Sequence, residues 1–202
     1  MKILAISASS RKGYNTDNLL ELFIKRFNFD KEDIKVINLK DLNVKGCQSC
    51  YGCGKVPMCV VKDDLTDIYP LIEDADIIIF SSPVYFNSVS YLAKTFIDRM
   101  QVYWSRKFIL KLSSLKEKFG VALINGGSSV EIEQFLGSEL VFDHFFKATG
   151  CKNNLFIEIS ETDKFPINDN NEYIRRLLDN LELNLSAKEK YRLKEGKIEK
   201  WN

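Results

Sequence analysis

The sequence lacks the features on which several common functions depend. Its 29 basic and 28 acidic residues nearly cancel, so no large positive field is available to neutralise phosphates, and we expect no nucleic-acid binding. No apolar run approaches the roughly 18 residues that indicate a membrane span, so we expect no membrane association. The single histidine, His144, lies among phenylalanines, which argues against acid–base catalysis by histidine. No catalytic side chain is predicted.

Thiols are also scarce, except in one loop. The N-terminal stretch "MKILAIS" is too short and too quickly polar for the apolar region of a signal peptide. We therefore expect a cytoplasmic protein, in which thiols are kept reduced. Four of the five cysteines nevertheless lie close together in loop 45–60, namely Cys47, Cys50, Cys53 and Cys59. In a reducing compartment such a group indicates metal binding or catalysis rather than a disulfide framework.

Short apolar runs alternate with amphipathic segments along the chain. The length of 202 residues predicts one domain over 1–202. The alternation favours an α/β fold with a parallel sheet and helices on both faces. The predicted strands cover 2–7, 34–39, 76–82, 119–125 and 154–159. The predicted helices cover 16–27, 63–75, 90–100, 129–150 and 172–186, followed by a polar, helical C-terminal tail.

The loop after the first predicted strand, "SASSRKGYNTDNLL" (7–20), contains hydroxyls and one arginine. It lacks both G-x-G-x-x-G and G-K-[ST], which argues against a standard dinucleotide site and a nucleotide triphosphatase. Arg11, the serine and threonine hydroxyls and the free N–H groups at the start of the next helix suit a phosphate dianion. The alternative is that Asn15 or Thr16 caps the helix and that the serines are turn residues.

Two further loops follow the third and fourth predicted strands. Ligands of such sheets bind beyond the carboxyl ends of the strands, so these loops are candidates for a binding site. In "SSPVYFNSVS" (81–90), Tyr85 and Phe86 offer flat apolar faces and Asn87 tolerates a left-handed backbone. In "INGGSS" (124–129), two glycines permit close approach of a ligand. Taken singly, each loop is also explained as a cover over the sheet edge or as a flexible turn.

The cysteine spacing C-x2-C-x2-C-x5-C points to a cluster of thiolate ligands. Four thiolates are the usual ligand set of a [4Fe–4S] cluster, and Gly46, Gly52 and Gly54 permit the turns that such a loop needs. Zinc sites usually present two C-x2-C pairs far apart in sequence, so zinc fits less well. Free thiols without a metal are the third alternative. Cys151, which stands alone, is predicted to be a small buried apolar residue.

Taken together, the loops resemble those of the flavodoxin-like NAD(P)H-dependent FMN reductases, in particular "ASSRKGYNT" (8–16) and "SPVYFNSVSYLAKTFIDR" (82–99). The resemblance covers roughly residues 1–150. It implies a flavodoxin-like, doubly wound, five-stranded parallel sheet in the order 2-1-3-4-5, and non-covalently bound FMN. The cofactor contacts that we predict are Ser9, Ser10, Arg11, Asn15, Thr16, Asp17, Asn18, Pro83, Val84, Tyr85, Phe86, Asn87, Ser88, Asn125, Gly126 and Gly127.

The cysteine run is similar to the compact motif of the iron–sulfur flavoproteins, a branch of the same group. That resemblance implies that Cys47, Cys50, Cys53 and Cys59 ligate a [4Fe–4S] cluster. The predicted function is therefore a flavin-dependent oxidoreductase that passes electrons between the cluster, FMN and a partner. The alternatives are an NAD(P)H-dependent FMN or quinone reductase without a cluster, and a zinc-stabilised binding module. The resemblance further implies ferredoxin or NAD(P)H as donor, and a homodimer or homotetramer.

Overall fold

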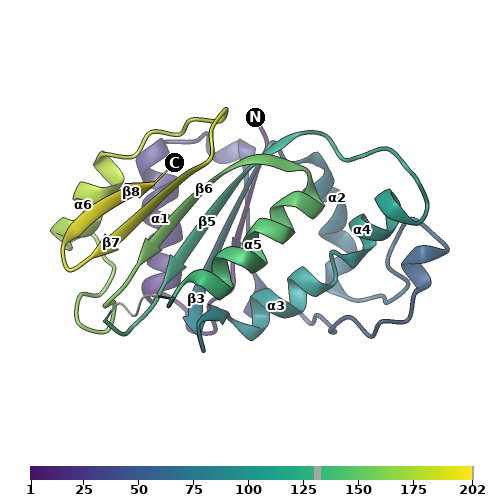
Figure 1. Cartoon of the computed structure of the whole chain (residues 1–202), viewed down its shortest axis with the longest axis horizontal. Coiled ribbons are helices and arrows are strands. Elements are labelled where there is room, and N and C mark those ends of the chain that lie inside the picture. Colours follow the sequence, from purple (N-terminus) through teal and green to yellow (C-terminus); the bar gives the residue numbers. More distant parts are fainter. Residues whose placement is uncertain (130–132, 202) are drawn as a thin grey trace.

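The computed structural model describes residues 1–129 and 133–201, and it has helices on both faces of a mostly parallel sheet (Figure 1). The main path of the sheet runs β2-β1-β3-β5-β6-β7-β8. All neighbours on this path are parallel except β7 and β8, and the short β4 pairs antiparallel with β3. The strands are β1 (Ile3–Ser7), β2 (Ile34–Asn38), β3 (Ile77–Tyr85), β4 (Ser88–Val89), β5 (Lys118–Asn125), β6 (Cys151–Ile159), β7 (Glu189–Lys194) and β8 (Lys197–Trp201).

The five predicted strands correspond to β1, β2, β3, β5 and β6, and the predicted order 2-1-3-4-5 is confirmed for them. The structure adds β7 and β8 beyond β6, which makes the sheet wider than predicted. β5 is buried along its whole length, as its apolar residues at successive positions predict for a strand covered on both faces.

Five of the described helices correspond to predicted ones with shifted ends, whereas α4 (Gln101–Phe108) was not predicted. The predicted helix 63–75 is split into a 3₁₀ turn, Asp64–Asp67, and α2, which begins at Tyr69 with a proline in its first turn. A proline is tolerated there because its missing N–H is not needed. Of the predicted helix 129–150, residues 130–132 lie outside the described part, and α5 begins at Leu136. The helices are α1 (Asn15–Phe27), α2 (Tyr69–Asp74), α3 (Tyr91–Asp98), α4 (Gln101–Phe108), α5 (Leu136–Thr149) and α6 (Glu172–Asp179).

The prediction of a helical C-terminal tail is wrong, because this segment forms β7 and β8. Tyr191 and Leu193 are buried on β7 and alternate with more exposed residues, the period of a half-buried strand. Glu195 and Gly196 both have a positive φ and join the strands in a two-residue hairpin of a kind that suits the twist of a sheet. The hairpin covers the edge that β6 would otherwise expose.

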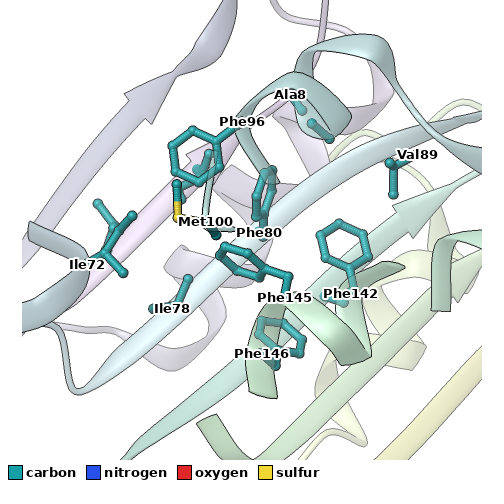
Figure 2. Close-up of a cluster of buried hydrophobic side chains, with 14 of the residues drawn as sticks. Ala8, Ile72, Ile78, Phe80, Val89, Phe96, Met100, Phe142, Phe145 and Phe146 are labelled. Carbon is teal, nitrogen blue, oxygen red and sulfur yellow. The ribbon is translucent and has the colours of Figure 1, made fainter. Parts of the chain in front are cut away.

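Two apolar clusters form the core, one on each face of the sheet. The first includes phenylalanines of β3, α3 and α5, which gather around Phe80 (Figure 2). The Phe80 ring centroid lies 5.5 Å from that of Phe96, 5.2 Å from Phe142 and 5.3 Å from Phe145, all edge to face. Each such pair adds about 0.5–1.5 kcal/mol beyond burial, so this cluster fixes β3 just before the strand ends at the candidate site. The second cluster packs α1 and α6 on the other face.

A buried carboxyl group, Glu158, and a half-buried one, Glu139, lie between α5, β6 and β7. Arg192 Nε donates a 2.7 Å hydrogen bond to Glu158 Oε2, and Lys190 Nζ donates a 2.8 Å bond to Glu139 Oε2. Within the part of the chain that the structure describes, Glu158 Oε1 is buried without a partner. Burial, helped by the neighbouring Glu139, raises the pKa of Glu158 to about 8, although Arg192 opposes the shift. Burial therefore favours the protonated form of Glu158 more strongly than that of an exposed carboxyl group.

Replacing Glu158 by glutamine is expected to make the folded protein increasingly stable relative to the wild type as the pH rises. The carboxyl group ionises near pH 4.5 in the unfolded chain and near pH 8 in the folded protein. Between these values Glu158 lowers the stability of the wild type as the pH rises, because folding then requires proton uptake. Glutamine cannot ionise, so the variant does not lose stability in this way. Urea unfolding of both proteins at pH 5, 6, 7 and 8 measures the difference, and parallel pH profiles would contradict a raised pKa of Glu158.

Among the described residues, no helix combines the length and the apolar character that crossing a bilayer requires.

Candidate functional site

A cavity of about 580 Å³ lies at the carboxyl ends of the parallel strands. Its volume is in the range of small-molecule sites. The loops after β1, β3 and β5 all line it, as predicted from the order of the strands. Ten of the predicted contacts are found in its wall: Arg11, Asn15, Pro83, Val84, Tyr85, Phe86, Asn87, Asn125, Gly126 and Gly127.

The remaining predicted contacts, Ser9, Ser10, Thr16, Asp17, Asn18 and Ser88, do not line this cavity. Several of them shape the first loop instead. Asp17 is nearly buried and accepts hydrogen bonds from Ser7 Oγ at 2.5 Å and from the Gly13 N–H at 2.9 Å. Ser9 Oγ donates to the carbonyl of Arg11 at 2.5 Å. These hydrogen bonds stabilise the conformation of the first loop without lining the cavity.

The N-terminus of α1 has no side-chain cap in the described structure. Its N-cap residue, Tyr14, makes no side-chain capping bond, so the alternative in which Asn15 or Thr16 caps the helix is wrong. The side chains of these two residues bind distant loops: Asn15 Nδ2 donates to the Thr162 carbonyl at 3.2 Å, and Thr16 Oγ1 donates to Asn125 Oδ1 at 2.8 Å. The first N–H groups of a helix have no acceptor within the helix. The positive end of the α1 dipole and these N–H groups are therefore free of a side-chain cap.

The second loop is a tight hairpin between β3 and β4. Tyr85 pairs with Ser88, and the two residues between them, Phe86 and Asn87, have φ values of 49° and 56°. Two successive left-handed residues are the pattern of a type I′ turn. The predicted left-handed backbone of Asn87 is confirmed. The same conformation at Phe86 was not expected, because it is strained for a bulky residue. The Phe86 side chain is fully exposed at the rim of the cavity.

Replacing Phe86 by asparagine is expected to stabilise the protein by about 1 kcal/mol. Among the described residues the Phe86 side chain has no buried contact to lose, and asparagine adopts left-handed angles more readily. The midpoint of urea unfolding in the absence of flavin measures the gain. An unchanged or lower midpoint would contradict the assignment of strain to this position.

The third loop is bound to a fourth loop, which sequence reasoning missed. The Gly126 carbonyl accepts a hydrogen bond from the Thr162 N–H at 3.0 Å, and the Gly127 carbonyl accepts one from the Asp163 N–H at 3.3 Å. The Gly126 N–H donates to the Ile159 carbonyl and is not available to a ligand. The cavity residues missed by the prediction are Ser128, Gln134, Thr162 and Asp163. The fourth loop follows the end of β6, so the strand-end rule applies to it as well.

The four clustered cysteines line a second cavity, of about 400 Å³. Its other wall comes from the end of α3 and from α4, including Arg99, Trp104 and Ser105. Cys47 and Cys50 are exposed, whereas Cys53 and Cys59 are half-buried. Within the described ranges, no group of three or more histidine, cysteine or acidic side chains is placed to hold a metal ion. Cys151, which is distant in sequence from the other four cysteines, is buried, as predicted.

The turns of the cysteine loop are not made by the glycines to which we assigned them. Ser49 and Tyr51 have positive φ values of 52° and 57°, whereas Gly46, Gly52 and Gly54 do not. Gly52 is required for another reason, because a Cβ there would lie 2.6 Å from a methyl carbon of Val60. Two strained residues on either side of Cys50 mark this loop as a candidate functional segment.

Helix α3 separates the two cavities. It is capped by Ser90, which follows the hairpin of the first cavity, and it ends at Asp98, which lines the second. Eight residues of α-helix span about 12 Å. No described residue lines both cavities.

The strand order and the cavity at the strand ends define a flavodoxin-like α/β protein. Smu.1420 from Streptococcus mutans superposes with a TM-score of 0.62 at 16% identity, over 89% of this chain and 95% of that one. An NAD(P)H:quinone oxidoreductase from Methanothermobacter marburgensis gives a TM-score of 0.60 at 14% identity, over 88% and 91%. At these identities the likeness establishes the fold alone.

The family follows from the sequence. The model of the NADPH-dependent FMN reductases matches residues 1–133, well over half of the chain, and the chain belongs to this family. Among curated proteins, an iron-sulfur flavoprotein of Archaeoglobus fulgidus is 31% identical over 61% of this chain and 54% of its own length. One of Methanosarcina thermophila is 33% identical over 63% and 64%. The match thus spans between about half and two thirds of these relatives.

Proposed function

We propose that the chain binds FMN in the cavity at the strand ends. The phosphate would lie at the open start of α1, where Arg11 and the hydroxyl of Ser10 add a charge and a donor. The hairpin at Tyr85–Ser88 and the loop at Asn125–Gly127 would hold the isoalloxazine ring. The observation that carries this proposal is the convergence of three strand-end loops on one cavity beside an uncapped helix terminus.

The cysteine cavity suits a [4Fe–4S] cluster by its donor set. Four thiols line one cavity, and a buried N–H of Arg99 without a partner among the described residues borders it. Cys47, Cys50, Cys53 and Cys59 would be the ligands. Because Cys47 and Cys50 are exposed, their side chains must turn inward to bind. The names of the relatives, iron-sulfur flavoprotein, support this assignment.

The function that we propose is a flavin-dependent oxidoreductase joining one- and two-electron carriers. FMN exchanges two electrons with a nicotinamide or quinone and one with a metal centre, whereas a [4Fe–4S] cluster passes one at a time. The protein supplies the phosphate site, the donors at the ring and the thiolates. NAD(P)H or a ferredoxin would be the electron donor in the cytoplasm, and the active form would be a homodimer or homotetramer.

A second candidate is an NAD(P)H-dependent FMN or quinone reductase without a cluster. It is favoured by the open arrangement of the thiols, two of which are exposed. A zinc-stabilised binding module is a third candidate, and the cavity at the strand ends argues against it.

Protein purified without oxygen tests all three candidates. Bound FMN with iron, and broad absorbance near 400 nm beyond the flavin bands, supports the iron–sulfur flavoprotein. FMN without iron after reconstitution, together with steady NAD(P)H oxidation, selects the plain reductase. Stoichiometric zinc without flavin selects the binding module. Failure to retain FMN in an excess of the cofactor would refute the proposed function.

A further inference from the structure

Arg99, the residue after α3, fastens the two ends of the cysteine loop. Its side chain is only 1% exposed. Nη1 donates a 2.7 Å hydrogen bond to the Lys45 carbonyl, and Nη2 donates a 3.1 Å bond to the Val61 carbonyl. Because Lys45 and Val61 flank the four cysteines, one guanidinium group closes the base of the whole loop.

Asp63 completes this closure as a buried ion pair. Its Oδ2 accepts a 2.6 Å hydrogen bond from Arg99 Nη1 and a 2.9 Å bond from the Lys45 N–H. Its Oδ1 accepts from the Leu65 N–H at 3.2 Å. Burial alone would raise the pKa of Asp63, but the hydrogen bonds from Arg99 and the backbone outweigh it and lower the pKa. The pair is therefore ionised, and the positive charge of Arg99 is fixed beside the cysteine cavity.

One donor of Arg99 is unused. Nε is buried and has no hydrogen-bond partner within the part of the chain that the structure describes, although Arg99 lines the cavity with the four thiols. A buried N–H of a charged group without an acceptor costs on the order of 1–3 kcal/mol or more. A buried donor of this kind is expected to have a partner, and the four cysteine sulfurs are among the acceptors that line this cavity.

A second donor lies on α4. Ser105 is 2% exposed and also lines the cavity. Its Oγ lies 3.3 Å from Cys53 Sγ, within hydrogen-bond distance. When Cys53 is a thiolate it can only accept, so the hydroxyl must then donate. The segment from Arg99 to Ser105, which we call the α3–α4 corner, thus presents two buried donors to one group of thiols.

We propose that the α3–α4 corner tunes the iron–sulfur cluster: Arg99 through Nε and Ser105 through Oγ donate hydrogen bonds to cysteinate sulfurs and raise the reduction potential of the cluster. This inference depends on the proposed cluster. Reduction adds a negative charge, so hydrogen bonds to the sulfurs and a nearby cation favour the reduced state. Arg99 and Ser105 are positioning residues in this proposal, because the cysteines alone bind iron.

The test is an anaerobic redox titration of reconstituted protein, followed by electron paramagnetic resonance of the reduced cluster. Ser105→Ala removes one donor with little risk to the fold. Arg99→Lys keeps the charge but lacks the Nε–H and the planar fork. In each variant we expect the ratio of reduced to oxidised cluster at a given potential to fall about tenfold, which is roughly 59 mV for a one-electron couple.

Arg106→Met is the matched control. It removes a positive charge from the same helix as Ser105, but Arg106 pairs with Glu73 and does not line the cysteine cavity. Its cluster should keep the wild-type potential. The amounts of FMN and iron bound per chain verify that each variant is folded and loaded. If Arg99→Lys does not hold iron, the potential of Ser105→Ala alone decides whether the proposal stands.

The outcomes separate the two proposals. A wild-type protein that holds FMN but no iron after reconstitution refutes the cluster and, with it, the role of the corner. If Ser105→Ala holds the cluster, and its ratio of reduced to oxidised cluster at a given potential stays within twofold of the wild-type ratio, the role of the corner alone is refuted. A shift of the same size in Arg106→Met would also overturn it, because the effect would then be one of general charge.

Discussion

Replacing Arg11 by glutamate is expected to weaken FMN binding about a hundredfold or more. Arg11 lines the cavity beside the open start of α1, where we place the phosphate. A charge-assisted hydrogen bond contributes about 1.5–3 kcal/mol, the new carboxylate would also repel the phosphate, and each 1.4 kcal/mol is a factor of ten. Titration of the apoprotein with FMN, followed by quenching of flavin fluorescence, measures the dissociation constant.

Lys12→Glu is the control for this prediction. It makes the same change of charge one residue away, on an exposed side chain that does not line the cavity. Its affinity for FMN should fall only slightly and recover with salt, because the effect is screened. Equal losses in the two variants would place the phosphate elsewhere. Riboflavin, which has no phosphate, should bind the wild type and Arg11→Glu with similar affinity.

Replacing Cys53 by serine is expected to remove the iron–sulfur cluster while FMN is retained. Cys53 is half-buried in the cysteine cavity and is held by Ser105, and a serine hydroxyl is a poor substitute for a thiolate ligand. Iron should fall from about four atoms per chain to nearly none. Iron analysis after anaerobic reconstitution, with the flavin-to-protein ratio measured on the same sample, checks both parts.

Cys151→Ala is the matched control, since it removes a thiol outside the cysteine loop. Cys151 is buried on the sheet, so the variant should lose some stability but keep both iron and FMN. If Cys53→Ser held as much iron as the wild type, the four-cysteine assignment would fail. If it lost FMN as well, the two cavities would not be independent, contrary to their separate linings.

The sequence by itself determined the class of the fold and the place of the candidate site. Apolar residues at successive positions of β3 and β5 bury both faces of a strand, and this local pattern is sufficient to predict a parallel sheet. The ends of β1, β3 and β5 then meet at one edge because parallel strands share a direction. The group of four cysteines could also be predicted from the sequence, because Cys47 and Cys59, its first and last members, lie close together in the chain.

The tertiary structure alone decided which side chains remain available to a ligand. Asn15 binds the Thr162 carbonyl, 147 residues away, and Thr16 binds Asn125, 109 residues away, so neither caps α1. The C-terminal segment became a hairpin because β6 offered an edge. Arg99 closes the cysteine loop only because α3 ends beside it. A local pattern sets the period of an element, but contacts over such separations depend on which segments the packed sheet brings together.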